Sequence, residues 1–248
     1  MSRSGSTTET VEAVKQFKNN QDGYAIAITN YGDQPLASLA DLAIVIPEGQ
    51  EVSIAQTKSF SSMFIASSAL PILISGRKDL FEKMHNLPKV GESLIKKYES
   101  IAKEFGENLG LDRFYFLGSG ARYGLASEAN LKMKEMSLTH SEPFYFLEFR
   151  HGPMSMINEN TAVIGLLSEK NRSYEEDVLI EMEALGGHVI SIAENTADIS
   201  FNSGLEELIR NILYLPALQM MAFYRSLSKG LDPDKPKNLS SVIHLKRL

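Results

Sequence analysis

Residues 114–138 read FYFLGSGARYGLASEANLKMKEMSL. The first four are apolar and are followed at once by Gly-Ser-Gly at 118–120, which predicts a short buried strand ending in a turn. A helical pattern then runs from about Leu125 to Leu138. Strand, glycine turn and helix in this order are typical of the units that build parallel sheets.

The same alternation extends along the chain on both sides of this segment. Short apolar runs predict further strands at 24–28, 42–46, 162–167 and 188–193. Longer apolar runs predict helices over 54–74 and 205–227, the second with Pro216 as a kink or early-turn residue. We therefore expect an α/β protein with parallel sheets flanked by helices.

Two helix starts carry the capping-box pattern. Ser6 with Glu9 precedes one amphipathic helix, and Ser173 with Glu176 precedes another. Gly186 is the expected stop of the second helix.

An internal repeat sets the expected domain organisation. Ala25–Asn30 aligns with Ile190–Asn195 at an offset of 165 residues. The first half contains no counterpart of residues 113–167. We thus expect a first domain that lacks its opening strand, helix and strand. The expected parts are a partial first domain at 1–76, a helical connector at 77–111, a second domain at 112–228 and a tail at 229–248.

Composition excludes several classes of protein. The 248 residues are 43% hydrophobic and 23% charged, as in an ordinary globular protein. A net charge of −6 argues against a nucleic-acid partner, and no apolar run reaches the roughly 20 residues of a membrane helix. The polar first residues and the absence of cysteine predict a cytoplasmic protein without disulfides.

The segment Ser2–Thr10 is a candidate anion site. It offers the hydroxyls of Ser4, Ser6, Thr7 and Thr8 around Gly5, which lets the backbone approach a ligand closely. The following helix would direct free N–H groups and its positive dipole end toward the same place. These features suit a sugar phosphate, and an ordinary serine-rich helix cap is the alternative.

A second candidate site lies on the helix after residue 120. Glu128, Lys132 and Glu135 have the spacing i, i+4, i+7 and share one helical face. A carboxylate there could abstract a proton alpha to a carbonyl, and a solvated face with an ion pair is the alternative. His151, in Arg150-His-Gly-Pro153, could move a further proton or be a simple turn residue. The other histidines lack metal-ligand spacing, so we expect no metal and no cofactor.

Together these motifs resemble the sugar isomerase (SIS) family, in particular the isomerase half of glucosamine-6-phosphate synthase and its stand-alone relatives. The resemblance spans essentially the whole chain in order. It rests on five segments: Ser2–Thr10, Thr57–Phe60, Glu128–Glu135, Glu148–Pro153 and Gly230–Leu239.

The resemblance implies two SIS domains, each a five-stranded parallel sheet between helices. It also implies a homodimer whose sites share residues across the interface. Carried over by position, the residues that would hold the phosphate and line the sugar are Ser2, Arg3, Ser4, Thr7, Ile54 and Gln56. Glu135 would move the proton between C1 and C2, with Lys132 and Glu128 beside it, and His151 of the partner subunit would assist ring opening.

The chain departs from that family in three ways. It has no glutaminase domain with a catalytic cysteine, which excludes glutamine-driven transfer by this chain alone. Ser241 stands where the synthase has a lysine two residues after Asn238-Leu239, which places Schiff-base chemistry there in doubt. The sequence starts at the phosphate loop, which agrees with the incomplete first domain expected from the repeat.

These observations predict a phosphosugar isomerase or deaminase that acts on a hexose or hexosamine 6-phosphate through a cis-enediol. One alternative is the isomerase component of a synthase whose glutaminase domain is absent from this chain. The other is a sugar-phosphate-binding module without turnover, which would need neither Glu135 nor His151.

Overall fold

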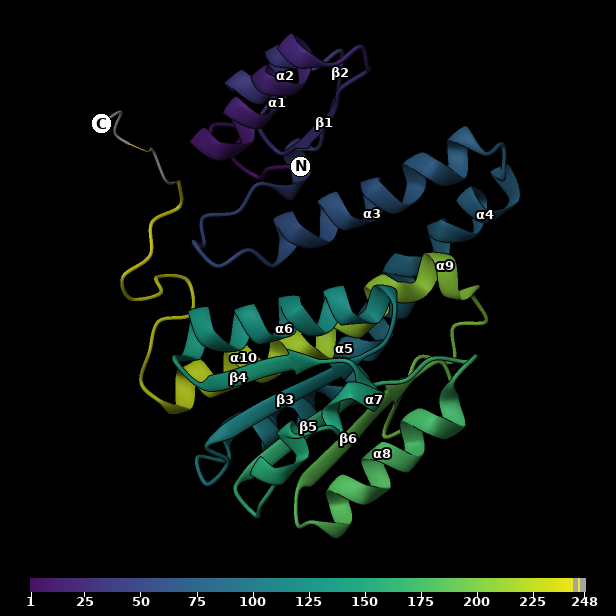
Figure 1. Cartoon of the computed structure of the whole chain (residues 1–248), viewed down its shortest axis with the longest axis vertical. Helices are drawn as coiled ribbons and strands as arrows, with labels where there is room; N and C mark the ends of the chain where they lie inside the picture. Colours follow the sequence, from purple (N-terminus) through teal and green to yellow (C-terminus); the bar gives the residue numbers. More distant parts are fainter. Residues whose placement is uncertain (243–244, 246–248) are drawn as a thin grey trace. The chain divides into compact units, whose positions relative to one another are not determined.

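The computed structural model describes residues 1–242 and 245 and divides the chain into two compact units (Figure 1). Unit 1 comprises Met1–Glu82 with Lys237–Leu248, and unit 2 comprises Lys83–Pro236. The expected tail at 229–248 is thus divided between the units, and its residues 243–244 and 246–248 lie outside the described part.

Unit 1 is built on a parallel pair of strands. β1 (Ile26–Thr29) pairs with β2 (Leu42–Val45), and α2 (Pro35–Leu39) makes the crossover between them. α1 (Thr8–Asn20) packs on α2, and α3 (Lys58–Ile74) packs against β1. Both strands lie where the apolar runs predict them. The five strands implied by the resemblance are not found among the described residues of this unit.

A hydrogen bond beside β1 reappears in unit 2. The amide of Ser2 donates to Ile28 O (3.1 Å), and the amide of Leu167 donates to Ile192 O (2.9 Å). Ser2 also forms an isolated parallel bridge with Thr29. The donors are 165 residues apart and the acceptors 164, within one residue of the offset of the sequence repeat, so the loop after Ser2 and the loop after Leu167 occupy corresponding places.

Unit 2 contains a five-stranded parallel sheet in the order β4-β3-β5-β6-β7. Its strands are β3 (Arg113–Gly118), β4 (His140–Phe144), β5 (Thr161–Leu166), β6 (His188–Ala193) and β7 (Ile199–Ser200). The apolar runs predicted β3, β5 and β6. They missed β4, a polar segment that contains Pro143, and the two-residue β7. The strand order reverses between β3 and β5, which is where open α/β sheets bind ligands.

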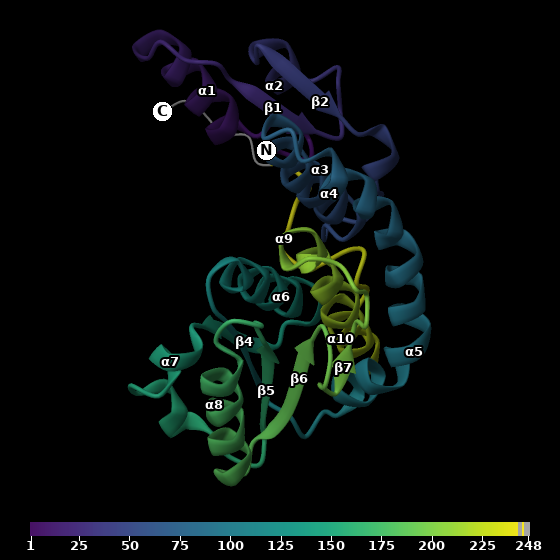
Figure 2. The ribbon, with the colours of Figure 1, turned by 90° about the vertical axis from the view of Figure 1, so that its right-hand side faces the viewer.

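Helices cover both faces of this sheet. They are α5 (Leu87–Glu107), α6 (Ala121–Ser137), α7 (Phe146–Phe149), α8 (Arg172–Ala184), α9 (Glu207–Arg210) and α10 (Leu215–Ser228); α4 (Lys78–Lys83) lies at the boundary of the units. Figure 1 shows α6 above the strands and α8 below them, and Figure 2 shows α5 and α10 on the side away from α7 and α8.

The segment expected as a connector, 77–111, is divided between the units, because α5 packs along α10 inside unit 2. The contact is close: a Cβ on Gly106 would come within 2.6 Å of Met221 O. The helix predicted over 205–227 is interrupted. α9 and a 3₁₀ turn at Asn211–Tyr214 precede α10, and Pro216 occupies the first turn of α10.

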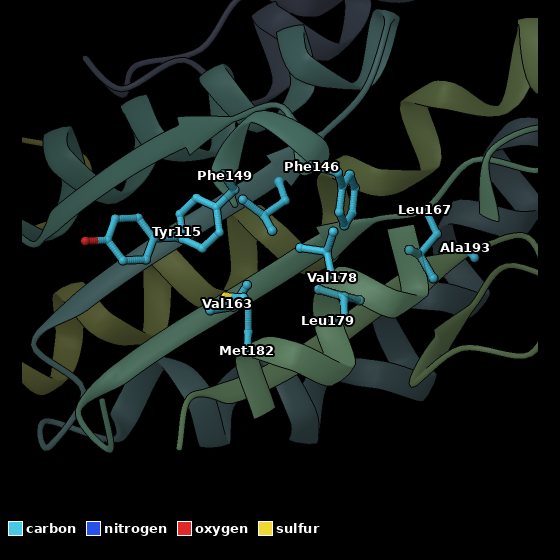
Figure 3. Packing of buried hydrophobic residues seen from close by; sticks show 10 residues of the cluster. Tyr115, Phe146, Phe149, Val163, Leu167, Val178, Leu179, Met182 and Ala193 are labelled. Atoms are coloured by element: carbon cyan, nitrogen blue, oxygen red, sulfur yellow. The ribbon is translucent and has the colours of Figure 1, made fainter. Parts of the chain in front are cut away.

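A hydrophobic cluster fixes α7 and α8 on the sheet (Figure 3). Phe146, Phe149, Val163, Val178 and Met182 are fully buried in it. This core holds β3 and β5 in place, and with them the loops at the carboxyl ends of both strands.

Candidate functional site

The loop between Ser2 and α1 borders a cavity in unit 1. The cavity has a volume of about 370 Å³. Its lining residues are Arg3, Ser4, Ser6, Tyr31, Gln34, Glu51, Val52, Ser241 and Val242. Two of the predicted phosphate residues, Arg3 and Ser4, thus face the cavity, whereas Ser2, Thr7, Ile54 and Gln56 are outside its lining.

Hydroxyl and amide groups give this loop its shape. Ser4 Oγ lies 3.4 Å from Thr7 Oγ1 and accepts from the amide of Ser6 at 3.3 Å. The amide of Gly5 donates to Ser2 Oγ at 3.2 Å. Gly5 has φ +65°, and a Cβ there would come within 3.0 Å of Gln34 Cβ, so the turn requires glycine. Thr7 is the N-cap of α1 without a side-chain capping bond, which leaves the helix N-terminus available to an anion.

The guanidinium of Arg3 holds neighbouring loops. It is 7% exposed and donates to Ser53 O (2.8 Å), Ile54 O (3.2 Å) and Ser241 O (3.4 Å). Ile54 therefore contacts the phosphate loop through its backbone carbonyl, which accepts a hydrogen bond from Arg3. Gln56 accepts from Ser59 Oγ at 3.3 Å. These contacts tie the segment before α3 and the chain at Ser241 to the loop.

Glu51 is a cavity residue that the sequence reasoning missed. Its carboxylate accepts from the amides of Thr57, Lys58 and Ser59 at 2.9–3.3 Å and from the hydroxyls of Thr57 and Ser59. Burial raises the pKa of Glu51, but the hydrogen bonds from Ser59, Thr57 and Lys58 outweigh burial and lower it below its usual range. The glutamate stands six to eight residues from these partners, so no capping motif marks it.

The three residues predicted to share a helical face do meet on α6. Lys132 Nζ lies 2.5 Å from Glu135 Oε2 and 3.5 Å from Glu128 Oε1. The side chains of Lys132 and Glu128 are 3% and 7% exposed, and that of Glu135 is 22% exposed. The alternative of a solvated surface ion pair is therefore wrong: this is a buried lysine between two carboxylates.

The ionisation of Glu128 is perturbed. Burial raises its pKa to about 7, the positive charge of Lys132 opposes the shift, and Glu135 adds to it. A carboxyl with a pKa near neutrality can accept or give a proton at physiological pH. The structure thus adds a second proton-transfer candidate beside the predicted Glu135.

His151 is not among the residues that pair within this cluster. It is exposed, in the turn after α7, and its amide donates to Glu148 O at 2.9 Å. Its neighbour Arg150 forms a bidentate ion pair with Glu181 at 2.7 and 2.8 Å. Across residues 1–242 and 245, no hydrogen bond or ion pair joins the His151 imidazole to Glu128, Lys132 or Glu135.

Residues 1–242 and 245 contain neither a candidate metal site nor a candidate membrane span. Their histidine, aspartate and glutamate side chains form no group of three or more that could hold a metal ion. Among the described helices, none is long and apolar enough to span a bilayer.

The sequence matches the SIS domain model over residues 1–73 and 111–216. The chain belongs to the SIS-domain family. The two matched segments include the loop at Ser2–Thr7 and the cluster on α6, and the predicted family resemblance is confirmed.

Relatives of this SIS protein carry related names. Glutamine–fructose-6-phosphate aminotransferase of Sulfolobus acidocaldarius is 31% identical over 250 residues, which cover 98% of this chain and 41% of the relative. The corresponding protein of Sulfurisphaera tokodaii is 29% identical over 246 residues, with 98% and 41% covered. The chain thus spans about two fifths of the length of these curated relatives.

Solved structures match the fold closely. Glucosamine-6-phosphate deaminase of Thermotoga maritima has a TM-score of 0.84 and 30% identity, with 98% of this chain and 74% of that chain covered. A tagatose-6-phosphate ketose/aldose isomerase assigned in Clostridium novyi has a TM-score of 0.86 and 25% identity, with 99% and 70% covered. Parallel sheets flanked by helices are therefore the family fold.

Proposed function

We propose that the chain acts on a hexose or hexosamine 6-phosphate as an isomerase or deaminase, by moving a proton between C1 and C2 through a cis-enediol. The observation that carries the proposal is the buried cluster of Glu128, Lys132 and Glu135 on α6 of a SIS protein. Sugar-phosphate binding alone needs no buried carboxylate beside a carboxyl of pKa about 7.

The phosphate group has a binding place of matching chemistry in unit 1. The hydroxyls of Ser4, Ser6 and Thr7, the amide-rich turn at Gly5 and the N-terminus of α1 offer donors to its oxygens. The contacts of Arg3 support a positioning role, because its guanidinium is engaged by the carbonyls of Ser53, Ile54 and Ser241. Ser2, Ile54 and Gln56 complete the proposed surroundings of the substrate.

The proposed proton transfer uses Glu135 as base. It takes the proton from C2 of the open-chain aldose and returns it to C1, while a second proton passes from the oxygen or nitrogen on C2 to O1. Lys132, 2.5 Å from Glu135 Oε2, fixes the position of the carboxylate through a charge-assisted hydrogen bond. With a 2-amino substituent the product of this step is an imine at C2, which water hydrolyses to the ketose and ammonia. His151 of a partner subunit assists ring opening in this proposal, since it meets none of these groups within one chain.

The first experiment separates proton transfer from binding. The protein is incubated with glucosamine 6-phosphate or fructose 6-phosphate in D₂O, and deuterium at C1 and C2 and released ammonia are followed by NMR and a coupled assay. Exchange that is lost in Glu135→Gln supports the proposal. Binding without deuterium exchange would instead identify a sugar-phosphate-binding module. If exchange persists in Glu135→Gln but is lost in Glu128→Gln, the base is Glu128.

A further inference from the structure

Unit 2 contains a loop that corresponds to the proposed phosphate loop of unit 1. The loops follow matching hydrogen bonds, from the amide of Ser2 to Ile28 O and from that of Leu167 to Ile192 O. In each, a serine Oγ accepts from the amide three residues later: Gly5 to Ser2 at 3.2 Å, and Asn171 to Ser168 at 3.0 Å. Each loop then enters a helix of 13 residues, α1 or α8.

The loop from Ser2 to the N-cap Thr7 is two residues longer than the loop from Ser168 to the N-cap Asn171, and the helices that follow differ at a position one turn after the N-cap. The fourth residue after the N-cap is Val11 in α1 and Glu175 in α8. Val11 is 8% exposed and brings no polar atom to its loop. Glu175 is 1% exposed, and its Oε2 accepts from the amide of Ser168 at 2.5 Å. A carboxylate of the protein itself therefore lies in the unit 2 loop, where unit 1 has an aliphatic side chain.

Other buried charges lie at the same end of the sheet, since Tyr214 is close enough to Glu175, Arg122 and Arg210 to interact electrostatically with all three. Arg122 and Arg210 are 6% and 4% exposed. Arg122 pairs with Glu207, and Arg210 lies 2.8 Å from Glu169 and 3.5 Å from Glu194. The Oε1 atom of Glu175 has no hydrogen-bond partner among the described residues. The place where open α/β sheets hold ligands is thus filled by the protein's own ion pairs.

We infer that Glu175 is a built-in anion, whose carboxylate takes in unit 2 the place that a phosphate group takes in unit 1. The loop at 168–171 is then a latent phosphate site, and the chain binds a single phosphate-bearing ligand. Without the carboxylate, the donors offered to a phosphate group would be the amide of Ser168 and the N-terminus of α8, because Arg122 and Arg210 are already engaged by glutamates. The comparison with unit 1 rests on the proposed function, whereas the filled loop is a feature of unit 2 itself.

The direct test removes the carboxylate. Isothermal titration with inorganic phosphate should give one phosphate per chain for the unaltered protein and two for Glu175→Ala. The matched control is Glu176→Ala, which removes the neighbouring carboxylate that pairs with Arg172 at 2.6 Å and should leave the count at one. A count that stays equal in Glu175→Ala and the unaltered protein overturns the inference.

The reciprocal test introduces a carboxylate beside the phosphate loop of unit 1. Val11→Glu places a carboxylate at the corresponding position and should weaken phosphate binding about tenfold or more, because like charges repel in a buried site. Val11→Gln has nearly the same size without the charge and should retain binding. Equal loss in both variants would show that size rather than charge matters, and would overturn the inference.

The outcomes separate this inference from the proposed function. No phosphate in the unaltered protein but one in Glu175→Ala would refute the phosphate loop of unit 1 and support the latent site. Folding of Glu175→Ala only in the presence of phosphate, followed by circular dichroism, would also support it. If Glu175→Ala folds neither with nor without phosphate, Glu175→Ser replaces it in the titration. If Glu175→Ser also fails to fold, the comparison of Val11→Glu with Val11→Gln decides.

Discussion

At the residue scale, Glu128 is a buried carboxyl whose ionisation opposes folding. Its pKa rises from 4.5 to about 7 on folding, so the folded state keeps a proton that the unfolded chain loses. Stability contributed by this group is therefore present at low pH and is lost as pH rises from 4.5 toward 7. In Glu128→Gln this loss should disappear. At about pH 8 the variant should be more stable than the unaltered protein by roughly 1–3 kcal/mol.

Urea unfolding at several pH values measures this difference directly, since other titrating groups cancel between variant and parent. Glu183→Gln on the exposed side of α8 is the control and should keep the parental pH dependence. Parallel pH profiles for Glu128→Gln and the parent would show that the carboxyl is ionised without cost in the folded protein.

The spacing of single residues predicted one half of the candidate site better than the other. Glu128, Lys132 and Glu135 could be placed together because helical periodicity is local and fixes which side chains share a face. Tyr31, Gln34 and Glu51 reach the cavity of unit 1 from a crossover and a loop. Their approach depends on how the chain returns to the sheet, and no short sequence pattern encodes that return.

At the scale of elements, the start of α3 depends on a side chain from outside the helix. Glu51 receives hydrogen bonds from the first residues of α3, including the amide and hydroxyl of Ser59. Glu51→Ala should lower the free energy of unfolding by about 1–2 kcal/mol, the usual cost of a lost cap. Glu48→Ala, in the same loop but exposed, should change it by less than about 0.5 kcal/mol.

The pH dependence of this effect identifies its cause. Because the hydrogen bonds lower the pKa of Glu51, its contribution is present above the unfolded value of 4.5 and is lost as pH falls through the folded value. The gap between Glu51→Ala and the parent in chemical denaturation should thus shrink in acid. A gap that is the same at every pH would point to lost packing.

The predicted helix starts were less accurate than the predicted helices. Both capping boxes were wrong: α1 begins after Thr7 and α8 after Asn171, without side-chain capping bonds. The helix expected from residue 54 begins at Lys58, because Arg3 binds the carbonyls of Ser53 and Ile54 that a helix would use. Gly186 does follow the end of α8, with φ +93°. Local signals therefore located the elements, and tertiary contacts set where they begin.

At the scale of the whole molecule, alternating strands and helices were enough to predict parallel sheets flanked by helices. The division into units was harder to predict. α5 is amphipathic, and its sequence does not indicate against which unit its apolar face packs. The structure places Leu94, Tyr98 and Ala102 in the interior of unit 2. The hydroxyl of Tyr98 donates to Ser200 O at 3.1 Å, which fixes α5 to the edge of the sheet.

The assembly has its own prediction, because the proposed site needs a histidine that the α6 cluster does not meet within one chain. His151→Ala and Glu135→Gln should each abolish turnover of glucosamine 6-phosphate alone. A dimer of one chain of each kind would contain one intact site, formed by Glu135 of the first variant and His151 of the second. Random pairing makes half of the dimers mixed, so the mixture should recover about a quarter of the parental activity.

Co-expression with two different affinity tags, followed by sequential purification, isolates the mixed dimer without relying on subunit exchange. The purified mixed dimer should show about half of the parental activity, since one of its two sites is intact. The matched control is a mixed dimer in which one chain carries both substitutions and the other none. It should be inactive if sites are shared, because each site then contains one defective residue. Activity in that control, and none in the first dimer, would place His151 and Glu135 of the same chain in one site.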